Sequence, residues 1–246
     1  AKGELIAFTG EEREVTLTAS ITFEGVTLTK DVKFKVKPIE EFARLKTAFT
    51  KENFEVVSGK VVGKKILVKD IAFYKDITDG FYVSSAENML GFVYGNRDKA
   101  VLKENKLYDM IATIDVYFGT FQLKDVSFIN EHEGTLPVVT AVEMTLDQIV
   151  ALPKPTNDTP NQHTLYKLVG TKVKVVDPAD NYKTFLVNKD LAASAPLNDT
   201  NSIMIYYKSD LAVIKTLNNI EIKSIEVINN GYRTNNVVWN VNFIGT

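Results

Sequence analysis

Hydrophobic and polar residues alternate along most of the chain, which is the pattern of β-strands with one buried face. The first example lies between residues 14 and 37, where apolar side chains occupy alternate positions on both sides of the turn signal Glu24-Gly25. This pattern predicts a β-hairpin whose apolar face needs a further surface to cover it.

Two short stretches have helical spacing instead. Directly after Pro38, apolar residues recur on one side of a helix at Ile39, Phe42, Leu45 and Phe49. This spacing predicts a helix over about residues 39–48. Thr145 and Gln148 have the spacing of a capping box, and the apolar residues that follow predict a second helix over residues 146–152.

A series of alternating segments follows each helix. After the first, strands are expected at 54–62, 65–74, 81–84, 90–94, 107–118 and 121–129. After the second, they are expected at 165–176, 184–188, 202–207, 220–228 and 232–244, with Trp239 on the buried face of the last strand. Asn230-Gly231 predicts a type I′ turn between the last two strands. Residues 38–129 and 145–246 therefore share one order of elements, a helix and then strands.

Five or six short strands in a module of this size indicate a small barrel. The predicted organisation is a hairpin at 1–37, a barrel module at 38–130, a connecting segment with a short helix at 131–162, and a second barrel module at 163–246. Within the connecting segment, Pro153–Gln162 holds three prolines and is expected to be an irregular loop.

Composition narrows the possible functions. The 246 residues carry a formal net charge of −2, which gives no overall attraction to nucleic acid or to an anionic membrane. There is no cysteine, so disulfides and thiolate chemistry are excluded. No apolar run is long enough to span a bilayer as a helix, so we expect no membrane insertion of these residues. The start at Ala1, without signal-peptide character, indicates a fragment of a longer polypeptide.

Four sequence runs carry a resemblance. Residues 11–38, EEREVTLTASITFEGVTLTKDVKFKVKP, resemble the end of an atrophied bacterial immunoglobulin-like domain. FEVVSGKVV, GFYVSS (80–85) and GFVYG (91–95) resemble OB-fold-like modules of bacterial secreted proteins, which often accompany a nuclease or phosphoesterase domain. The resemblance implies an all-β fold with two short helices, in which an immunoglobulin-like hairpin remnant precedes two small OB-like β-barrels. Ser84-Ser85 departs from the Gln-Asp pair common in that family, so no binding role of that pair is carried over.

Catalytic motifs are missing from the sequence. Glu131-His132-Glu133 resembles a metal ligand set, but strand alternation points His132 away from both glutamates. His163 has no acidic partner nearby and is assigned no role. Ser84 lacks a nucleophile elbow, residues 59–65 lack the spacing of a phosphate loop, and Asp177, Asp180 and Asn181 are explained by a β-turn as well as by calcium. We therefore predict no enzyme, no metal and no cofactor.

Aromatic and basic residues are the remaining candidates for binding. OB-folds bind single strands or oligosaccharides across one barrel face, where rings stack on bases or sugars. The candidates are Tyr74, Tyr82, Tyr94, Lys69, Lys75 and Arg97 in the first module, and Tyr206, Tyr207, Tyr232 and Arg233 in the second. Packing in the core is the alternative role for each tyrosine.

The sequence and the resemblance together predict a monomeric, non-catalytic pair of modules from a bacterial extracellular or cell-surface protein. These modules would be a spacer, and a substrate-binding accessory to a catalytic domain outside these residues. One alternative is single-stranded nucleic-acid binding, which needs Lys69, Lys75 and Arg97 on the same face as exposed tyrosines. The other is a carbohydrate or adhesion module, which would show exposed tyrosines without a basic rim.

Overall fold

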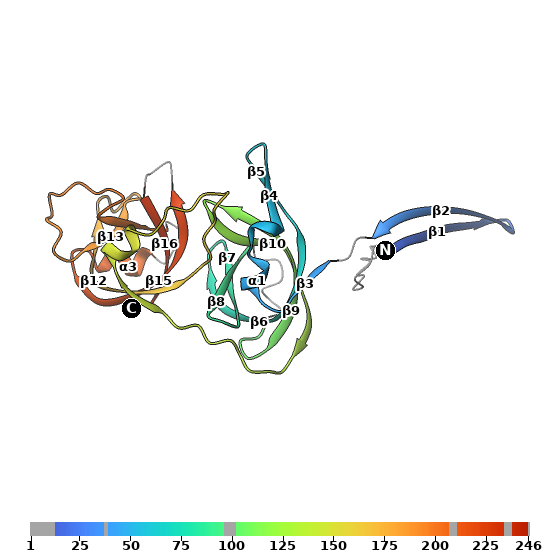
Figure 1. Ribbon diagram of the computed structural model, residues 1–246, viewed down its shortest axis with the longest axis horizontal. Coiled ribbons are helices and arrows are strands. Elements are labelled where there is room, and N and C mark those ends of the chain that lie inside the picture. Colours follow the sequence, from blue (N-terminus) through green and yellow to red (C-terminus); the bar gives the residue numbers. More distant parts are fainter. Residues whose placement is uncertain (1–12, 37–38, 96–101, 207–210, 234–237, 246) are drawn as a thin grey trace. The chain divides into compact units, whose positions relative to one another are not determined.

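The computed structural model describes residues 13–36, 39–95, 102–206, 211–233 and 238–245. The chain divides into two compact units, Ala1–Glu41 and Phe42–Thr246. The first contains a hairpin and the second contains two β-barrels (Figure 1).

The predicted N-terminal hairpin is confirmed. Strands β1 (Arg13–Phe23) and β2 (Val26–Val36) form a two-stranded antiparallel sheet, in which Phe23 pairs with Val26. Glu24 and Gly25 in the turn have φ values of 47° and 79°, as a type I′ turn requires. Among the described residues its large apolar side chains are exposed, for example 66% for Ile21 and 73% for Phe23.

The first barrel follows the order β6 (Lys65–Ile77), β7 (Gly80–Ser85), β8 (Met89–Tyr94), β10 (Thr120–His132) and β9 (Leu107–Tyr117). Pairing of β6 with β9 closes the sheet on itself. All neighbouring pairs are antiparallel except β8 with β10. A small hairpin of β4 (Phe54–Val57) and β5 (Lys60–Gly63) precedes the barrel, where a single strand was expected, because Ser58 and Gly59 form a turn with positive φ.

The second barrel repeats this arrangement. Its strands follow the order β12 (Leu165–Val175), β13 (Thr184–Asn188), β14 (Ser202–Ile205), β16 (Val238–Gly245) and β15 (Glu221–Arg233), and β12 pairs with β15 to close it. The parallel pair is β14 with β16, the counterpart of β8 with β10. Helix α3 (Leu211–Thr216) lies between β14 and β15 in sequence. The predicted all-β fold with small barrels is therefore present, and the two barrels share one topology.

A short helix precedes each barrel and packs into its core. Helix α1 (Leu45–Ala48) buries Leu45 and Ala48, and α2 (Leu146–Val150) buries Leu146 and Ile149. The capping box of α2 is confirmed, since the Gln148 amide donates to Thr145 Oγ1 at 3.3 Å and the Thr145 amide donates to Gln148 Oε1 at 2.8 Å.

The first helix is shorter than the helical spacing predicts. Residues Glu40–Phe42 form strand β3, which pairs with β6. In the second barrel, β11 (Val142–Thr145) pairs in the same way with β12 before α2 begins. Pairing with an open barrel strand provides backbone hydrogen bonds that override the weak local preference for helix.

Asn230-Gly231 does not form the predicted hairpin turn, because β15 continues to Arg233. The register between β15 and β16 shifts between Asn229 and Tyr232, which makes these residues a β-bulge with Gly231 at φ 87°. The connection between the two strands and the side chain of Trp239 lie outside the described residues.

The connecting segment is irregular, as expected, but it is held against the first barrel. Asn161 exchanges backbone hydrogen bonds with the β9–β10 turn, donating to Gly119 O at 2.8 Å and accepting from the Phe121 amide at 3.2 Å. Asn157 Oδ1 accepts from the Gly119 amide at 3.1 Å. A side chain at Gly119 would collide with Pro155, so this contact requires glycine.

Candidate functional site: the pocket between the barrels

The outer face of β7 and β8 is the starting point of the site. Strand alternation sends Phe81 and Val83 into the first core and turns Tyr82, Leu90 and Phe92 outward. The outward residues are nevertheless buried, because they form a third apolar cluster with Leu165 and Ile228 of the second barrel. This cluster joins the two barrels within one compact unit.

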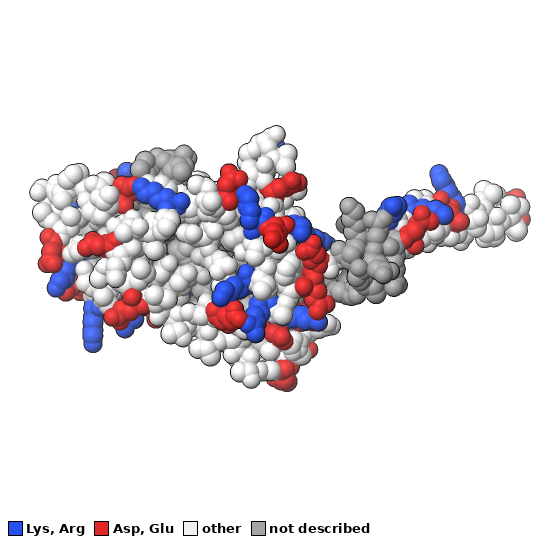
Figure 2. All heavy atoms as spheres, in the orientation of Figure 1, with Lys and Arg blue, Asp and Glu red and all other residues white. Residues whose placement is uncertain are grey.

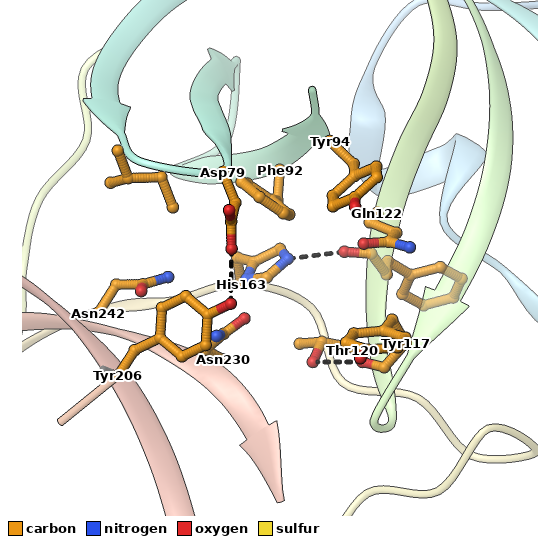
Figure 3. A pocket seen from close by; sticks show the side chains of 12 residues that line it. Asp79, Phe92, Tyr94, Tyr117, Thr120, Gln122, His163, Tyr206, Asn230 and Asn242 are labelled. Carbon is orange, nitrogen blue, oxygen red and sulfur yellow. Dashed lines mark hydrogen bonds between the residues drawn. The ribbon is translucent and has the colours of Figure 1, made fainter. Parts of the chain in front are cut away.

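His163 lies in the middle of this contact and is only 2% exposed. Its Nε2 lies 2.6 Å from the carbonyl oxygen of Phe121 in the first barrel (Figure 3). Its Nδ1 lies 2.9 Å from that of Asn229 in the second. Its ring also meets Tyr82 edge-on, with 5.3 Å between centroids. Burial lowers the pKa of His163, although both carbonyl acceptors favour its protonated form.

Two further side-chain hydrogen bonds cross between the barrels. Asn242 Nδ2 of β16 donates to the hydroxyl of the fully buried Tyr82 at 2.6 Å, and the Tyr206 hydroxyl donates to Asp79 Oδ2 at 2.6 Å. Figure 3 shows Asp79 and Tyr206 pointing toward one another. These bonds satisfy polar groups at the edge of an apolar contact, which fixes the geometry of the pocket walls.

Beside these bonds a small pocket opens at the surface. Its walls carry Tyr94 and Tyr117 from the first barrel, which are 57% and 55% exposed, and Tyr206 from the second. The polar side chains that line it are Asp79, Thr120, Gln122, His163, Asn230 and Asn242. Its enclosed volume is about 30 Å³, room for one or two water molecules, so a larger ligand would lie across the exposed rings. None of the described residues that line it is Lys or Arg.

The structure distributes the predicted binding residues unevenly. Tyr94 and Tyr206 meet at the pocket. Tyr82 and Tyr232 are buried, with 0% and 6% exposure, and offer no ring face to a ligand; packing explains both. Lys154 Nζ lies over the Tyr232 ring, 4.8 Å from its centroid, and the Tyr232 hydroxyl donates to Asp199 Oδ2 at 3.0 Å.

The remaining predicted residues do not join this pocket. Tyr74 is half-buried, and burial together with nearby Glu226 raises its pKa. Lys69 is half-buried and Lys75 is exposed on β6, and neither lines the pocket. Arg97, Tyr207 and the side chain of Arg233 lie outside the described residues.

The other histidine belongs to a different cluster. His132 Nε2 lies 3.6 Å from both Asp70 Oδ1 and Asp109 Oδ1, while its two glutamate neighbours face away, as strand alternation requires. Glu131 pairs with Lys103 at 2.7 Å, which lowers the pKa of Glu131, and Glu133 pairs with Lys106. Within the described residues, no group of three or more His, Asp and Glu side chains could hold a metal ion.

Sequence reasoning missed the central position of His163, Asp79 and Asn242. Each is a single polar residue near a turn or within a strand, and no local spacing marks it. The duplication was the only available signal for the site as a whole. It places Tyr94 and Tyr206 at equivalent positions, at the end of β8 and directly after β14.

Lys, Arg, Asp and Glu are interspersed on the visible face of the two-barrel unit (Figure 2). No described helix is long and apolar enough to cross a membrane.

Comparisons of the chain with protein-family models, with curated proteins and with solved structures found no match. The fold therefore defines the class, a tandem of two OB-like barrels.

Proposed function

We propose that this chain is a non-catalytic module pair of a bacterial extracellular or surface protein. It acts as a spacer and binds a carbohydrate at the pocket between the barrels, on behalf of a catalytic domain elsewhere in the parent protein. The extracellular setting rests on the resemblance of residues 11–38 to the ends of immunoglobulin-like domains.

The observation that carries the carbohydrate proposal is the composition of the pocket rim. Tyr94 and Tyr117 present exposed rings beside a carboxylate and three side-chain amides, with no Lys or Arg among the described lining residues. Flat rings stack on the apolar face of a sugar, and amide and carboxylate groups accept and donate hydrogen bonds to its hydroxyls. The carbohydrate alternative called for exposed tyrosines without a basic rim.

Single-stranded nucleic acid has less support. Backbone recognition needs cations along the stacking surface, and Lys69 and Lys75 do not line this pocket. Interspersed charges on the visible face also leave no continuous basic band there (Figure 2).

A glycan array probed with the 246-residue chain tests the proposal. Binding to a defined set of neutral oligosaccharides should be lost in Tyr94→Ala and Tyr117→Ala, since each removes a ring from the rim. Phe34→Ala is the matched control, because the ring of Phe34 is 42% exposed on strand β2 of the hairpin and does not line the pocket. Absence of glycan binding, together with salt-sensitive binding of labelled single-stranded DNA, would replace carbohydrate by nucleic acid.

The spacer role draws on the N-terminal hairpin. Its exposed apolar side chains, among them Leu28 at 66%, are the inner face that a second β-sheet would cover. We propose that such a sheet belongs to the immunoglobulin-like part of the parent protein. Protein extended upstream of residue 1 should then protect the hairpin amides from hydrogen exchange, and unchanged exchange would contradict this.

A further inference from the structure

The first barrel contacts the second through the outer face of β7 and β8. The second barrel has a groove on its equivalent face, over β13 and β14. In the first barrel the outward cross-strand pair of β7 and β8 is Tyr82 with Phe92, which the second barrel covers. The equivalent outward pair of β13 and β14 is Phe185 with Met204. No other barrel covers this pair in the described structure, but Met204 is buried at 3% exposure, so Phe185, which is half-buried, is the member of the pair that a ligand in the groove can contact.

The groove is large enough for a small organic molecule. Its volume is about 900 Å³, at the upper end of the range typical of small-molecule sites. About half of its exposed lining is apolar, and the apolar residues are Val175, Val176, Phe185, Ala193, Ala195, Pro196, Leu197 and Met204. Such a surface favours the apolar part of a ligand.

Lysine side chains hold the loops that wall the groove. Lys172 Nζ donates to the carbonyl oxygens of Lys189 and Leu191, both at 2.8 Å. Two residues further along β12, Lys174 Nζ donates to those of Ala193 at 2.8 Å and Ala195 at 3.4 Å.

The opposite wall is held in the same way. Lys215 Nζ of α3 donates to Pro178 O at 2.7 Å and to Asn181 Oδ1 at 2.9 Å. Charge-assisted bonds to successive carbonyls fix both loops in place, so a ligand would meet a largely preformed site.

The charged groups of the lining are Lys174, Lys183 and Asp180. An ammonium group has three N–H donors, and Lys174 uses two of them on loop carbonyls. The Lys183 side chain is exposed, and Asp180 Oδ1 already accepts the Tyr182 amide at 2.8 Å. With two lysines and one aspartate, the charged part of the lining is net positive, and it lies beside the apolar residues of the groove.

We propose that this groove is a second binding site, specific for a small amphipathic carboxylate. The apolar body of the ligand lies over Phe185 and Val176, and its carboxylate receives hydrogen bonds from Lys174 and Lys183. This site is separate from the inter-barrel pocket and does not depend on the carbohydrate proposal.

Isothermal titration of the full 246-residue chain with decanoate, below its micellar concentration, tests the proposal. Decyltrimethylammonium has the same chain with the opposite charge and serves as the comparison ligand. We expect saturable decanoate binding with a Kd below about 1 mM and at least tenfold weaker binding of the cation. Lys183→Met should weaken decanoate binding about tenfold, and Lys60→Met, an exposed lysine of β5 in the other module, should leave it unchanged.

Filling the groove is the decisive variant. Ala195→Trp should abolish decanoate binding while the circular dichroism spectrum stays that of the wild type, and Ala193→Trp replaces it where the first does not fold. The proposal is overturned by a wild type that does not bind decanoate, by equal affinity for the cation, or by folded Trp variants that bind as the wild type does.

Discussion

The Nε2 atom of His163 lies 2.6 Å from the carbonyl oxygen of Phe121, although the two residues belong to different barrels. The other ring nitrogen is directed at Asn229 O, so one imidazole joins the two barrels through their backbones. A neutral ring donates to one of these two carbonyl oxygens, which would lose its partner without the ring, and a protonated ring donates to both.

Replacing His163 should therefore be costly. His163→Ala removes the hydrogen bond that the neutral ring donates and leaves a cavity in the contact, and we expect a loss of about 3 kcal/mol in the free energy of unfolding. Urea denaturation followed by circular dichroism measures this. His132→Ala is the internal control, since His132 is more exposed and should lose less than about 1 kcal/mol. Equal effects of the two changes would contradict the role assigned to His163.

The same residue should make stability depend on pH. Burial lowers the pKa of His163 below its ordinary value of 6.5, so the unfolded chain binds a proton more readily than the folded chain. The stabilisation is then complete above pH 6.5 and falls as the pH drops from there toward the lower folded pKa. Asp79 lines the same pocket, and it is present in both the wild type and the His163 variant that are compared below.

Denaturation of the wild type and of His163→Gln between pH 7.5 and 5 checks this. The wild type should lose stability with acidification more steeply than the variant. A wild type that gains stability on acidification would mean that the two carbonyls hold a protonated ring.

Gly231 should tolerate no side chain, for two reasons that can be separated. Its φ is 87°, and an added Cβ would collide with the carbonyl oxygen of Phe118 in the other barrel. Gly170 has a φ of 65° with open space around it. Gly170→Ala should therefore cost only the left-handed backbone strain, about 1 kcal/mol, and Gly231→Ala about 3 kcal/mol. Equal losses in thermal unfolding would show that the backbones do not approach closely there.

Two buried threonines should be replaceable with no loss. Thr171 Oγ1 and Thr184 Oγ1 in the second barrel have no hydrogen-bond partner among the residues that the structure describes, and both residues are fully buried. Thr171→Val and Thr184→Val exchange an unsatisfied hydroxyl for a methyl group of similar size, which should raise stability by up to about 1 kcal/mol each. Thr120→Val is the matched control, because the hydroxyl of this buried threonine donates to Tyr117 O at 3.2 Å, and it should lose about 1 kcal/mol.

The hairpin should be dispensable for the barrels. Among the described residues its strands pair only with each other, and its side chains are exposed except Val15, which is half-buried. A chain that starts at Pro38 should therefore melt within about 2 °C of the full chain by circular dichroism. A large fall in melting temperature would show that the hairpin contributes to the core of the first barrel.

Local chemistry explains which elements the sequence could predict. Alternation gave the strands, because each barrel strand has one face in the core and side chains change face at every residue. Thr145 and Gln148 gave the second helix, because a capping box satisfies the helix end with residues three positions apart. The helical spacing of Ile39 and Phe42 led to a wrong prediction for the start of the first helix, since this spacing does not reveal that strand β6 is available for pairing.

The candidate site was only partly accessible to the same reasoning. Tyr94 and Tyr206 could be named as exposed-ring candidates, but Tyr82 and Tyr232 have the same strand context and are buried. Tyr82 is buried because the second barrel packs against it, and Tyr232 is buried in the core of the second barrel itself. No local pattern in the sequence distinguishes these positions from those of Tyr94 and Tyr206. Asn230-Gly231 likewise has the composition of a turn, and its use as a bulge follows from the approach of Phe118.

The sequence by itself determined the all-β class, the capped second helix and the duplication, because these depend on interactions between residues close in the chain. Only the tertiary structure decided that His163 joins the barrels, that the tyrosines divide between core and pocket, and that one barrel face is covered while its counterpart is open. Those outcomes depend on contacts between residues that lie 40 to 160 positions apart, such as His163 with Phe121 and Asn242 with Tyr82.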